Sequence, residues 1–179
     1  ILSLTSKNGL SFYKEKLTSR YHVTTYLTRQ FPILKSSEKL YLGSYSPQIN
    51  IYYLHNDKWL IGFGTQIKNF VNKDFIHRSD TNNIYLLSFY TQSLYNIKIS
   101  KSIDFYLGMK SGFLRPIKNI TSLKKNLNYR KEFFFSLSAV STTQINNNLH
   151  FTLVSDLWCG VNTNRFSALE LGGGVTYKL

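Results

Sequence analysis

The stretch that decides the fold is the last one, A-L-E-L-G-G-G-V-T-Y-K-L at residues 168–179. From Leu169 onward its odd-numbered positions are apolar apart from Gly173, and its even-numbered positions are small, polar or charged. Side chains alternate between the two faces of a β-strand, so this segment predicts a strand with one apolar and one polar face. Many sheets contain one such strand, and the fold therefore depends on whether the rest of the chain repeats it.

Seven further segments repeat this alternation. We expect strands at about 21–31, 39–54, 59–69, 84–97, 103–115, 129–143 and 149–160. The second of them changes phase at Ser46-Pro47, which predicts a bulge there, because proline cannot donate to a β-ladder. These strands would be about 11–16 residues long, whereas strands of soluble proteins usually have 3–10 residues.

The predicted connections alternate in length. Tight turns are expected at 55–58, 98–102 and 145–148, and long loops at 32–38, 70–83 and 116–128, with a shorter last loop at 162–165. Outer-membrane barrels have short turns at one end and long loops at the other. Residues 1–18 alternate poorly, and we expect them to form an N-terminal arm, as a short helix or an irregular strand, before a barrel at 19–179.

The amino-acid composition limits the classes of protein to which this chain can belong. The chain has 13 Tyr and 13 Phe, a content that favours strands over a helical bundle. No apolar run approaches the roughly 18 residues of a membrane-spanning helix, so a membrane location requires a closed barrel or a surface position. The net charge of +13 fits either simple solubility or a polyanionic partner such as nucleic acid or a lipid phosphate. Cys159 is alone, which excludes an internal disulfide.

The polar faces of the predicted strands carry most of the charge. We expect the following residues to point into the barrel: His22, Lys68, Asp104, Lys110, His150, Asp156, Glu170 and Lys178. A narrow barrel is filled by side chains, and buried charges must pair, so we expect Asp104 and Glu170 to neutralise lysines such as Lys110 and Lys68. The outward faces are nearly uncharged, as lipid requires, whereas a soluble barrel would need the reverse arrangement.

From Tyr21 to Leu179 the pattern resembles the small eight-stranded outer-membrane barrels of Gram-negative bacteria, the OmpA/OmpX type. Those barrels close on a strand with alternate apolar residues and a terminal aromatic; Leu171, Val175 and Tyr177 match, and Leu179 replaces the aromatic. The resemblance implies an all-β fold, a single eight-stranded antiparallel up-and-down transmembrane barrel. It also implies the bacterial outer membrane as location, and insertion by the barrel-assembly machinery.

Catalytic and metal chemistry have weak support in the sequence. The histidines are not spaced as metal ligands, and residues 172–174 lack the lysine and helix of a phosphate-binding loop, so we expect no metal and no cofactor. Some small barrels modify lipid A with His, Asp and Ser, and the loop residues His77, Ser79 and Asp80 could take that part. The segment 150–152 is similar to the His-x-Ser pair of the deacylase type, with Thr in place of Ser. Adjacency alone defines no triad, so we assign no catalytic residue.

Basic residues gather around the loop expected at 116–128. The candidate contacts to anionic lipid are Lys118, Lys124, Lys125, Arg130 and Lys131. Such side chains can hold lipopolysaccharide phosphates, although a solvated loop has the same composition. The aromatic residues follow the apolar faces and are not interleaved with the basic ones, so we expect no nucleic-acid partner.

The leading function is structural, adhesive or partner-binding interaction at the cell surface, with outer-membrane lipid, lipopolysaccharide or a protein at the outer loops as partner. Two alternatives remain open at this point. One is a lipid A-modifying acyl hydrolase or acyltransferase barrel. The other is a soluble, lipocalin-like ligand-binding barrel.

Overall fold

The computed structural model describes residues 2–5, 11–14, 20–33, 41–56, 58–72, 83–98, 102–117, 132–160 and 167–179. Its strands are β1 (Leu2–Thr5), β2 (Ser11–Lys14), β3 (Tyr21–Pro32), β4 (Tyr41–Gly43), β5 (Tyr45–His55), β6 (Trp59–Asn72), β7 (Asn83–Lys98), β8 (Ile103–Pro116), β9 (Glu132–Gln144), β10 (Leu149–Gly160) and β11 (Ser167–Lys178). Within these ranges there is no helix of the length and apolarity that a membrane crossing needs.

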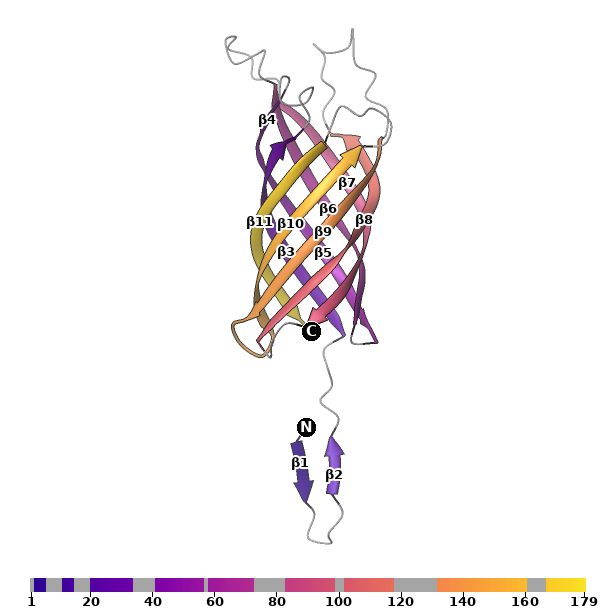
Figure 1. Cartoon of the computed structure of the whole chain (residues 1–179), viewed down its shortest axis with the longest axis vertical. Coiled ribbons are helices and arrows are strands. Elements are labelled where there is room, and N and C mark those ends of the chain that lie inside the picture. The colour runs from indigo at the N-terminus through magenta and orange to yellow at the C-terminus, as the bar shows by residue number, and fades with distance from the viewer. Residues whose placement is uncertain are drawn as a thin grey trace.

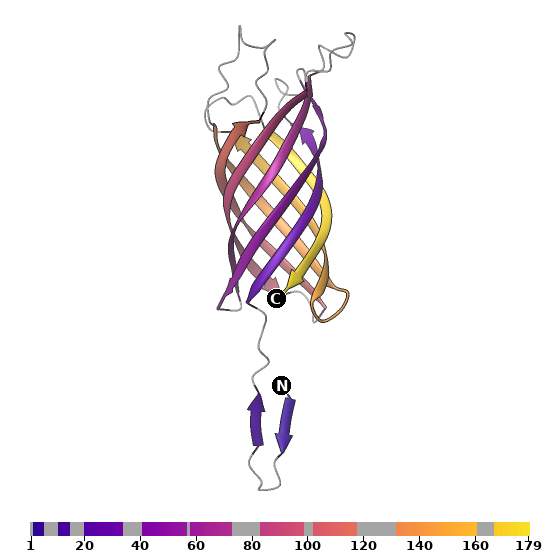
Figure 2. The ribbon, with the colours of Figure 1, turned by 180° about the vertical axis from the view of Figure 1, so that it is seen from behind.

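Strands β3 to β11 form a closed antiparallel barrel (Figures 1 and 2). Each barrel strand pairs with its neighbours in the chain, β6 pairs with β7, and β11 pairs back onto β3. Strands β4 and β5 are two parts of one strand interrupted at Ser44, since both pair with β6. The described strands thus make an eight-stranded barrel, and the predicted fold class is confirmed.

The interruption between β4 and β5 is a bulge. Gly43 lies opposite Phe70 and Gln48 lies opposite Gln66, so five steps along this strand face four along β6. Pro47, which has no N–H to donate, lies inside this stretch. A bulge was expected at Ser46-Pro47. The residue that separates the strands β4 and β5 is Ser44. From Tyr45 onward, β5 pairs with β3 in a regular register.

The registers fix the tilt of the strands. One circuit across paired residues leaves β3 at His22 and returns to it at Pro32, ten residues further on. The residues on the circuit are His22, Tyr52, Gly62, Gln92, Lys110, Ser136, Trp158, Ala168 and Pro32. With a rise of about 3.3 Å per residue and about 4.8 Å between strands, this stagger tilts eight strands by roughly 41°. A strand of 12 residues then spans about 30 Å along the barrel axis, enough to cross a bilayer core.

The connections divide by length between the two ends of the barrel. The strand ends that flank 33–40, 73–82, 117–131 and 161–166 lie at one end, here called the loop end. The strand ends that flank the short connections at 56–58, 99–102 and 145–148, and the C-terminal residue, lie at the other, the turn end (Figure 1). This is the alternation that the sequence predicts.

The turns use residues suited to them. Asn56 has a positive φ of 50°, a conformation that asparagine adopts more readily than most side chains. The side-chain oxygen of Asn146 accepts hydrogen bonds from the backbone N–H groups of Asn148, at 3.0 Å, and Leu149, at 2.8 Å. Such local bonds satisfy backbone donors that the ladder leaves unpaired.

Before the barrel, β1 and β2 pair with each other in an antiparallel register that places Leu2 opposite Lys14. The segment expected to be a short helix or an irregular strand therefore contains two paired strands.

Candidate functional site

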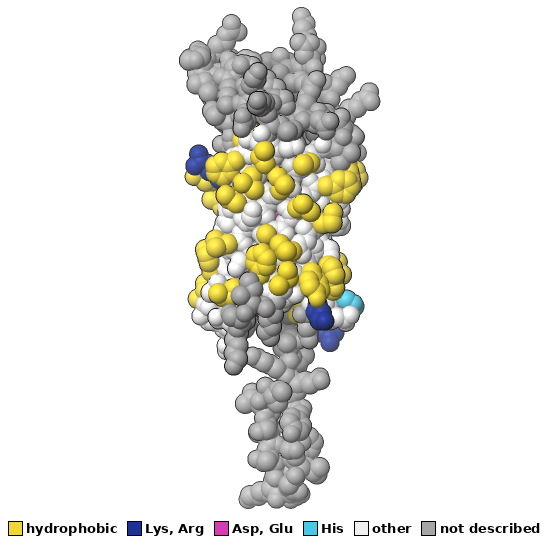
Figure 3. All heavy atoms as spheres, in the orientation of Figure 1, with side chains coloured by type: hydrophobic (Ala, Val, Ile, Leu, Met, Phe, Trp, Pro, Cys, Tyr) yellow, Lys and Arg dark blue, Asp and Glu magenta, His cyan; other side chains and the backbone are white. Residues whose placement is uncertain are grey.

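The barrel has the polarity of a membrane protein. In every barrel strand whose side chains are described, odd-numbered residues point outward and even-numbered residues point inward. Large exposed apolar residues are distributed around the outer surface, for example Leu27, Ile49, Ile61, Phe63, Phe89, Met109, Leu137, Leu153 and Leu171. Figure 3 shows that, on one face, they form two bands with smaller side chains and backbone between them. Such a surface suits hydrocarbon rather than water.

Tyrosine and tryptophan side chains lie on the outer surface of five adjacent strands near the turn end. Trp59 and Tyr95, on β6 and β7, have ring centres 4.9 Å apart, and Tyr21 and Tyr53, on β3 and β5, have ring centres 5.5 Å apart. Tyr177 on β11 adds a fifth exposed ring. Rings with one apolar and one polar part are favoured where hydrocarbon meets the headgroup region of a bilayer.

The interior cluster nearest the loop end is built around Glu170. Its carboxylate pairs with the ammonium of Lys68 and accepts hydrogen bonds from Gln30 Nε2, at 3.0 Å, and from Gln66 Nε2, at 2.8 Å. The Lys68 Nζ also lies 4.2 Å from the centre of the Trp158 ring. All five side chains are buried. Charge pairing, hydrogen bonds and a ring face together replace the water that both charges lose.

A second charged cluster lies at mid-height. Lys110 Nζ is 2.5 Å from Asp156 Oδ2 and 3.2 Å from Gln48 Oε1. The Tyr90 hydroxyl lies 2.9 Å from Gln48 Oε1 and 2.6 Å from Asn50 Oδ1, and the Tyr90 ring faces the Lys110 ammonium at 5.1 Å. These contacts join β5, β7, β8 and β10 through the centre of the barrel.

Between this cluster and the turn end, the interior becomes aromatic and aliphatic. The buried residues of this layer are Tyr26, Tyr52, Leu60, Leu94, Tyr106, Val140 and Val154. This layer differs from the polar inner faces that the alternation predicts. The available signal was that 84–97 has apolar residues at both odd and even positions; the even-numbered Leu86 and Leu94 of β7 point inward.

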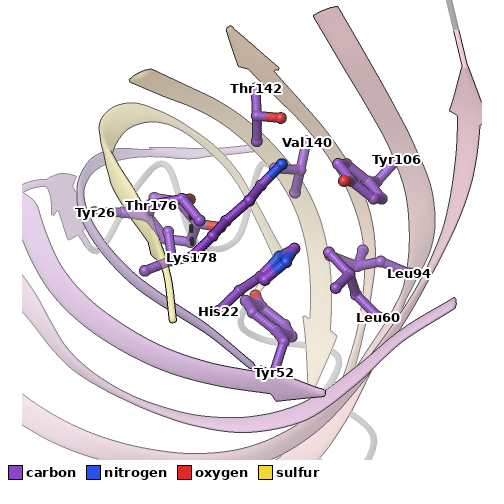
Figure 4. Close-up of a pocket in the computed structure, with 11 residues that line it drawn as sticks. His22, Tyr26, Tyr52, Leu60, Leu94, Tyr106, Val140, Thr142, Thr176 and Lys178 are labelled. Carbon is purple, nitrogen blue, oxygen red and sulfur yellow. Dashed lines mark hydrogen bonds between the residues drawn. The ribbon is translucent and has the colours of Figure 1, made fainter. Parts of the chain in front are cut away.

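The turn end of the interior carries the third ion pair, between Lys178 and Asp104, whose charged atoms are 3.6 Å apart (Figure 4 shows Lys178). His22 and His150 are buried at the same level. Next to His22 and Lys178 is a cavity of about 10 Å³, close to the volume that one water molecule needs. A space of this size holds no larger ligand.

The lysine that pairs with Asp104 differs from the expected one. Asp104 was expected to neutralise Lys110, but both lie on β8, six residues apart, which is about 20 Å along a strand. Asp104 instead meets Lys178 of β11 across the interior, and Lys110 meets Asp156 of β10. Glu170 of β11 meets Lys68 of β6.

Two glycines of the closing strand, Gly172 and Gly174, leave no room for a Cβ against β3. A Cβ on Gly174 would be 1.8 Å from the carbonyl oxygen of Thr25, a distance that no side chain allows. On the opposite face Leu171, Val175, Tyr177 and Leu179 are exposed. At Gly172 and Gly174 the closing strand therefore permits close backbone approach.

Several candidates lie outside the described residues. These are the loop cations Lys118, Lys124, Lys125, Arg130 and Lys131, and the loop residues His77, Ser79 and Asp80. The other enzyme-like segment is described: His150 and Thr152 point into the barrel, and the Thr152 hydroxyl is 2.7 Å from that of Thr176. Among the described residues, no three His, Cys, Asp or Glu side chains are placed to hold a metal ion.

No protein-family model matches the chain, and no curated protein matches its sequence. Solved structures do match. Neisserial surface protein A shares 15% identity with a TM-score of 0.62, covering 89% of this chain and 97% of that one. A de novo designed transmembrane β-barrel shares 11% identity with a TM-score of 0.53, covering 93% and 100%.

The outer-membrane protein Ail of Yersinia pestis matches as well. In a phospholipid nanodisc it shares 9% identity with a TM-score of 0.54, covering 88% of this chain and 99% of that one. In complex with the heparin analogue sucrose octasulfate it shares 11% identity with a TM-score of 0.50, covering 88% and 96%. At these identities the likeness concerns the fold, which is that of the small transmembrane barrels.

Proposed function

We propose that this protein is an outer-membrane barrel of a Gram-negative bacterium that acts by interaction at the cell surface. The observation that carries the proposal is the inverted polarity of a closed barrel, with ion pairs inside and an apolar belt outside. A barrel of this kind has no free strand edge and exposes apolar side chains to hydrocarbon, so a bilayer is the solvent in which it is stable. The fold shared with Ail and Neisserial surface protein A supports the same location.

The packed interior directs the function to the outside of the barrel. The Lys68–Glu170 and Lys110–Asp156 pairs fill the cross-section at two levels, and the described cavity near the turn end has room for about one water molecule. In this proposal the barrel is a rigid support, and its connections at the loop end provide the contact surface.

The loop between β8 and β9 is the proposed contact region. It carries the five cations Lys118, Lys124, Lys125, Arg130 and Lys131 within 14 residues. Clustered Lys and Arg bind phosphate or sulfate groups through charge-assisted hydrogen bonds. Ail was solved with a sulfated sugar, which supports an anionic partner for a barrel of this fold. The proposed partners are therefore the phosphates of lipopolysaccharide or the anionic groups of a neighbouring surface.

Membrane residence is tested by fractionation. The protein should appear in the outer-membrane fraction, need detergent for extraction, and migrate differently on a gel before and after heating. A monodisperse protein that stays in solution without detergent would refute the location.

The loop cations are tested by replacing all five with Gln and measuring retention on immobilised heparin and on lipopolysaccharide. We expect the variant to elute at much lower salt, because exposed charge contacts weaken with ionic strength. A matched control replaces Lys7, Lys14 and Lys16 of the N-terminal segment, and it should elute as the unchanged protein does. Equal losses in both variants would show that only net charge matters.

A further inference from the structure

The outer surface of β6 to β9 contains a hollow that the proposed function does not use. Its volume is about 490 Å³, within the range of roughly 300–1,000 Å³ typical of ligand sites. Phe63, Phe89, Phe113 and Phe133 surround it, and three of these rings are more than half exposed: Phe63 at 62%, Phe89 at 55% and Phe113 at 56%. The rings of Phe113 and Phe133 stand edge to face, with centres 5.2 Å apart.

The floor of the hollow is made of small residues whose polar groups are satisfied within the sheet. The Thr91 hydroxyl is 3.3 Å from the Ser111 hydroxyl, and both residues line the hollow between the rings. Gly112 completes the floor, where the β7 backbone leaves no room for a Cβ: one would lie 2.1 Å from the Phe89 carbonyl oxygen. The base of the hollow therefore consists of small side chains without free polar groups, and the larger phenylalanine rings surround it.

A cation stands at the loop-end side of the hollow. Arg115 follows Ser111 and Phe113 on the outward face of β8, so its Cα is about 13 Å along the strand from that of Ser111. Its side chain is exposed, and its register partner is Leu87. The carboxylates whose side chains are described, Asp104, Asp156 and Glu170, all pair with lysines inside the barrel.

This combination is specific to one side of the barrel. A second outward hollow of about 510 Å³, lined by Leu107, Leu137, Ser155 and Leu157, contains neither a cation nor an aromatic ring. The other outward arginine of the described strands, Arg29, lies on β3, four strands away from β8 in either direction, and its guanidinium packs on Phe31. Of these two hollows in the described part of the barrel, the one on β6–β9 has both aromatic rings and an arginine beside it.

From this arrangement we propose a lipid-binding site for lipid A on the outside of β6–β9. The acyl chains lie in the hollow against the phenylalanine rings, and a phosphate accepts hydrogen bonds from Arg115. The proposal depends on the outer-membrane location given above, since only there does the loop end face the leaflet that contains lipid A. The positions of the two parts along the barrel axis fit a lipid A molecule. Arg115 lies at the loop-end margin of the apolar belt, at the level of the phosphates, and the hollow lies closer to the bilayer centre, at the level of the acyl chains.

The breadth of the site favours lipid A over a two-chain phospholipid. Four strands at about 4.8 Å spacing give the hollow a width of roughly 14 Å, enough for several chains side by side. The guanidinium supplies paired N–H donors that fit phosphate oxygens, which a point charge does not.

The test measures bound lipid by native mass spectrometry. The full chain is refolded into micelles that contain lipid A, at the lipid concentration where half of the unchanged protein carries one lipid A molecule. We expect Arg115→Gln to weaken lipid A binding about tenfold, since a charge-assisted contact is lost. Ser111→Phe, which fills the hollow, should weaken it similarly. The matched controls are Arg29→Gln, on the opposite side, and Ser155→Phe, in the second hollow. Both should bind as the unchanged protein does.

Two further arms identify the lipid. Dephosphorylated lipid A should bind the unchanged protein as weakly as lipid A binds Arg115→Gln, and phosphatidylglycerol should bind weakly to all variants. Equal losses for Arg115→Gln and Arg29→Gln, no loss for Ser111→Phe, or a stronger Arg115-dependent affinity for phosphatidylglycerol would overturn the proposal. Insertion into vesicles is measured first, by heat-modifiable migration. Failure to insert refutes the outer-membrane proposal, whereas insertion without selective lipid A binding refutes only this site.

Discussion

Breaking the Lys68–Glu170 pair while leaving its surroundings in place is the most informative perturbation of this barrel. Glu170→Gln removes the negative charge but keeps the size of the side chain, and it leaves the Lys68 ammonium buried. The new amide also presents N–H donors where the Lys68 ammonium and the Gln30 and Gln66 amides already donate. Lys68→Met is the complementary change, and it leaves a carboxylate that still accepts the two glutamine hydrogen bonds.

The expected losses of unfolding free energy differ because Glu170→Gln leaves an unpaired buried ammonium, whereas Lys68→Met leaves a carboxylate that keeps two hydrogen bonds. Removing one partner of a buried ion pair destabilises a protein by about 3–5 kcal/mol. We expect Glu170→Gln at the upper end of that range, and Lys68→Met at the lower end. The double variant should lie within about 2 kcal/mol of the unchanged protein, because a neutral pair has no unmet charge. The two single losses sum to at least about 6 kcal/mol, so the coupling between the two sites should be about 4 kcal/mol or more.

The assay is equilibrium unfolding by urea in lipid vesicles, followed by tryptophan fluorescence. In a Trp59→Phe background the signal comes from Trp158, whose ring centre is 4.2 Å from the Lys68 ammonium. The probe therefore reports on the perturbed cluster itself, and gel mobility before and after heating reports on the whole barrel. Agreement of the two transitions shows that unfolding is two-state.

A coupling below about 0.5 kcal/mol, with both single variants only mildly destabilised, would refute the reasoning. That result would mean that water reaches the cluster and solvates each charge separately. As a matched control we propose Lys178→Met, which removes a partner of the 3.6 Å pair at the more open turn end. Its loss should be smaller than that of either buried variant.

Three other predictions concern packing, lipid exposure and depth. Gly64→Ala would place a Cβ 2.7 Å from the Tyr90 ring, and we expect it to lower the unfolding free energy by about 1–3 kcal/mol in the same urea assay; an unchanged midpoint would contradict the packing described here. Leu137→Arg, half-way up the lipid-facing surface, should destabilise the barrel in vesicles by about 2–4 kcal/mol, while Thr143→Arg near the turn end should stay within about 1 kcal/mol. Equal effects would show that the outer surface does not face hydrocarbon. Lipids brominated near their headgroups should quench Trp59 more strongly than lipids brominated at chain ends, because Trp59 belongs to the turn-end ring of aromatics; the opposite order would move the membrane boundary.

The outward and inward faces could be predicted because the side-chain period of a strand is two. Once Val175 and Tyr177 are outward, Thr176 and Lys178 must be inward, whatever the neighbouring strand is. The same rule, applied to each segment, predicts inner faces for Lys68, Lys110, Asp156 and Glu170 without any tertiary contact. It also predicted the number of strands, since eight segments repeat the pattern.

The partners inside the barrel could not be predicted, because they depend on the stagger between strands. The ten-residue offset around the barrel decides which inward residues share a level. It brings Asp104 to Lys178 and Asp156 to Lys110, although the chain offers several acids and lysines of equal chemistry. The aromatic and aliphatic layer at Tyr26, Tyr52 and Leu94 is a product of the same stagger.

The closing segment 168–179 shows both contributions. Its sequence alone determines a two-faced strand with glycines at 172–174, because those properties are local. Only the closed barrel decides that this backbone is β3, that Glu170 receives hydrogen bonds from two glutamines and a lysine, and that Lys178 reaches Asp104. These contacts join residues more than 70 positions apart in the chain, and the register of the whole sheet sets them.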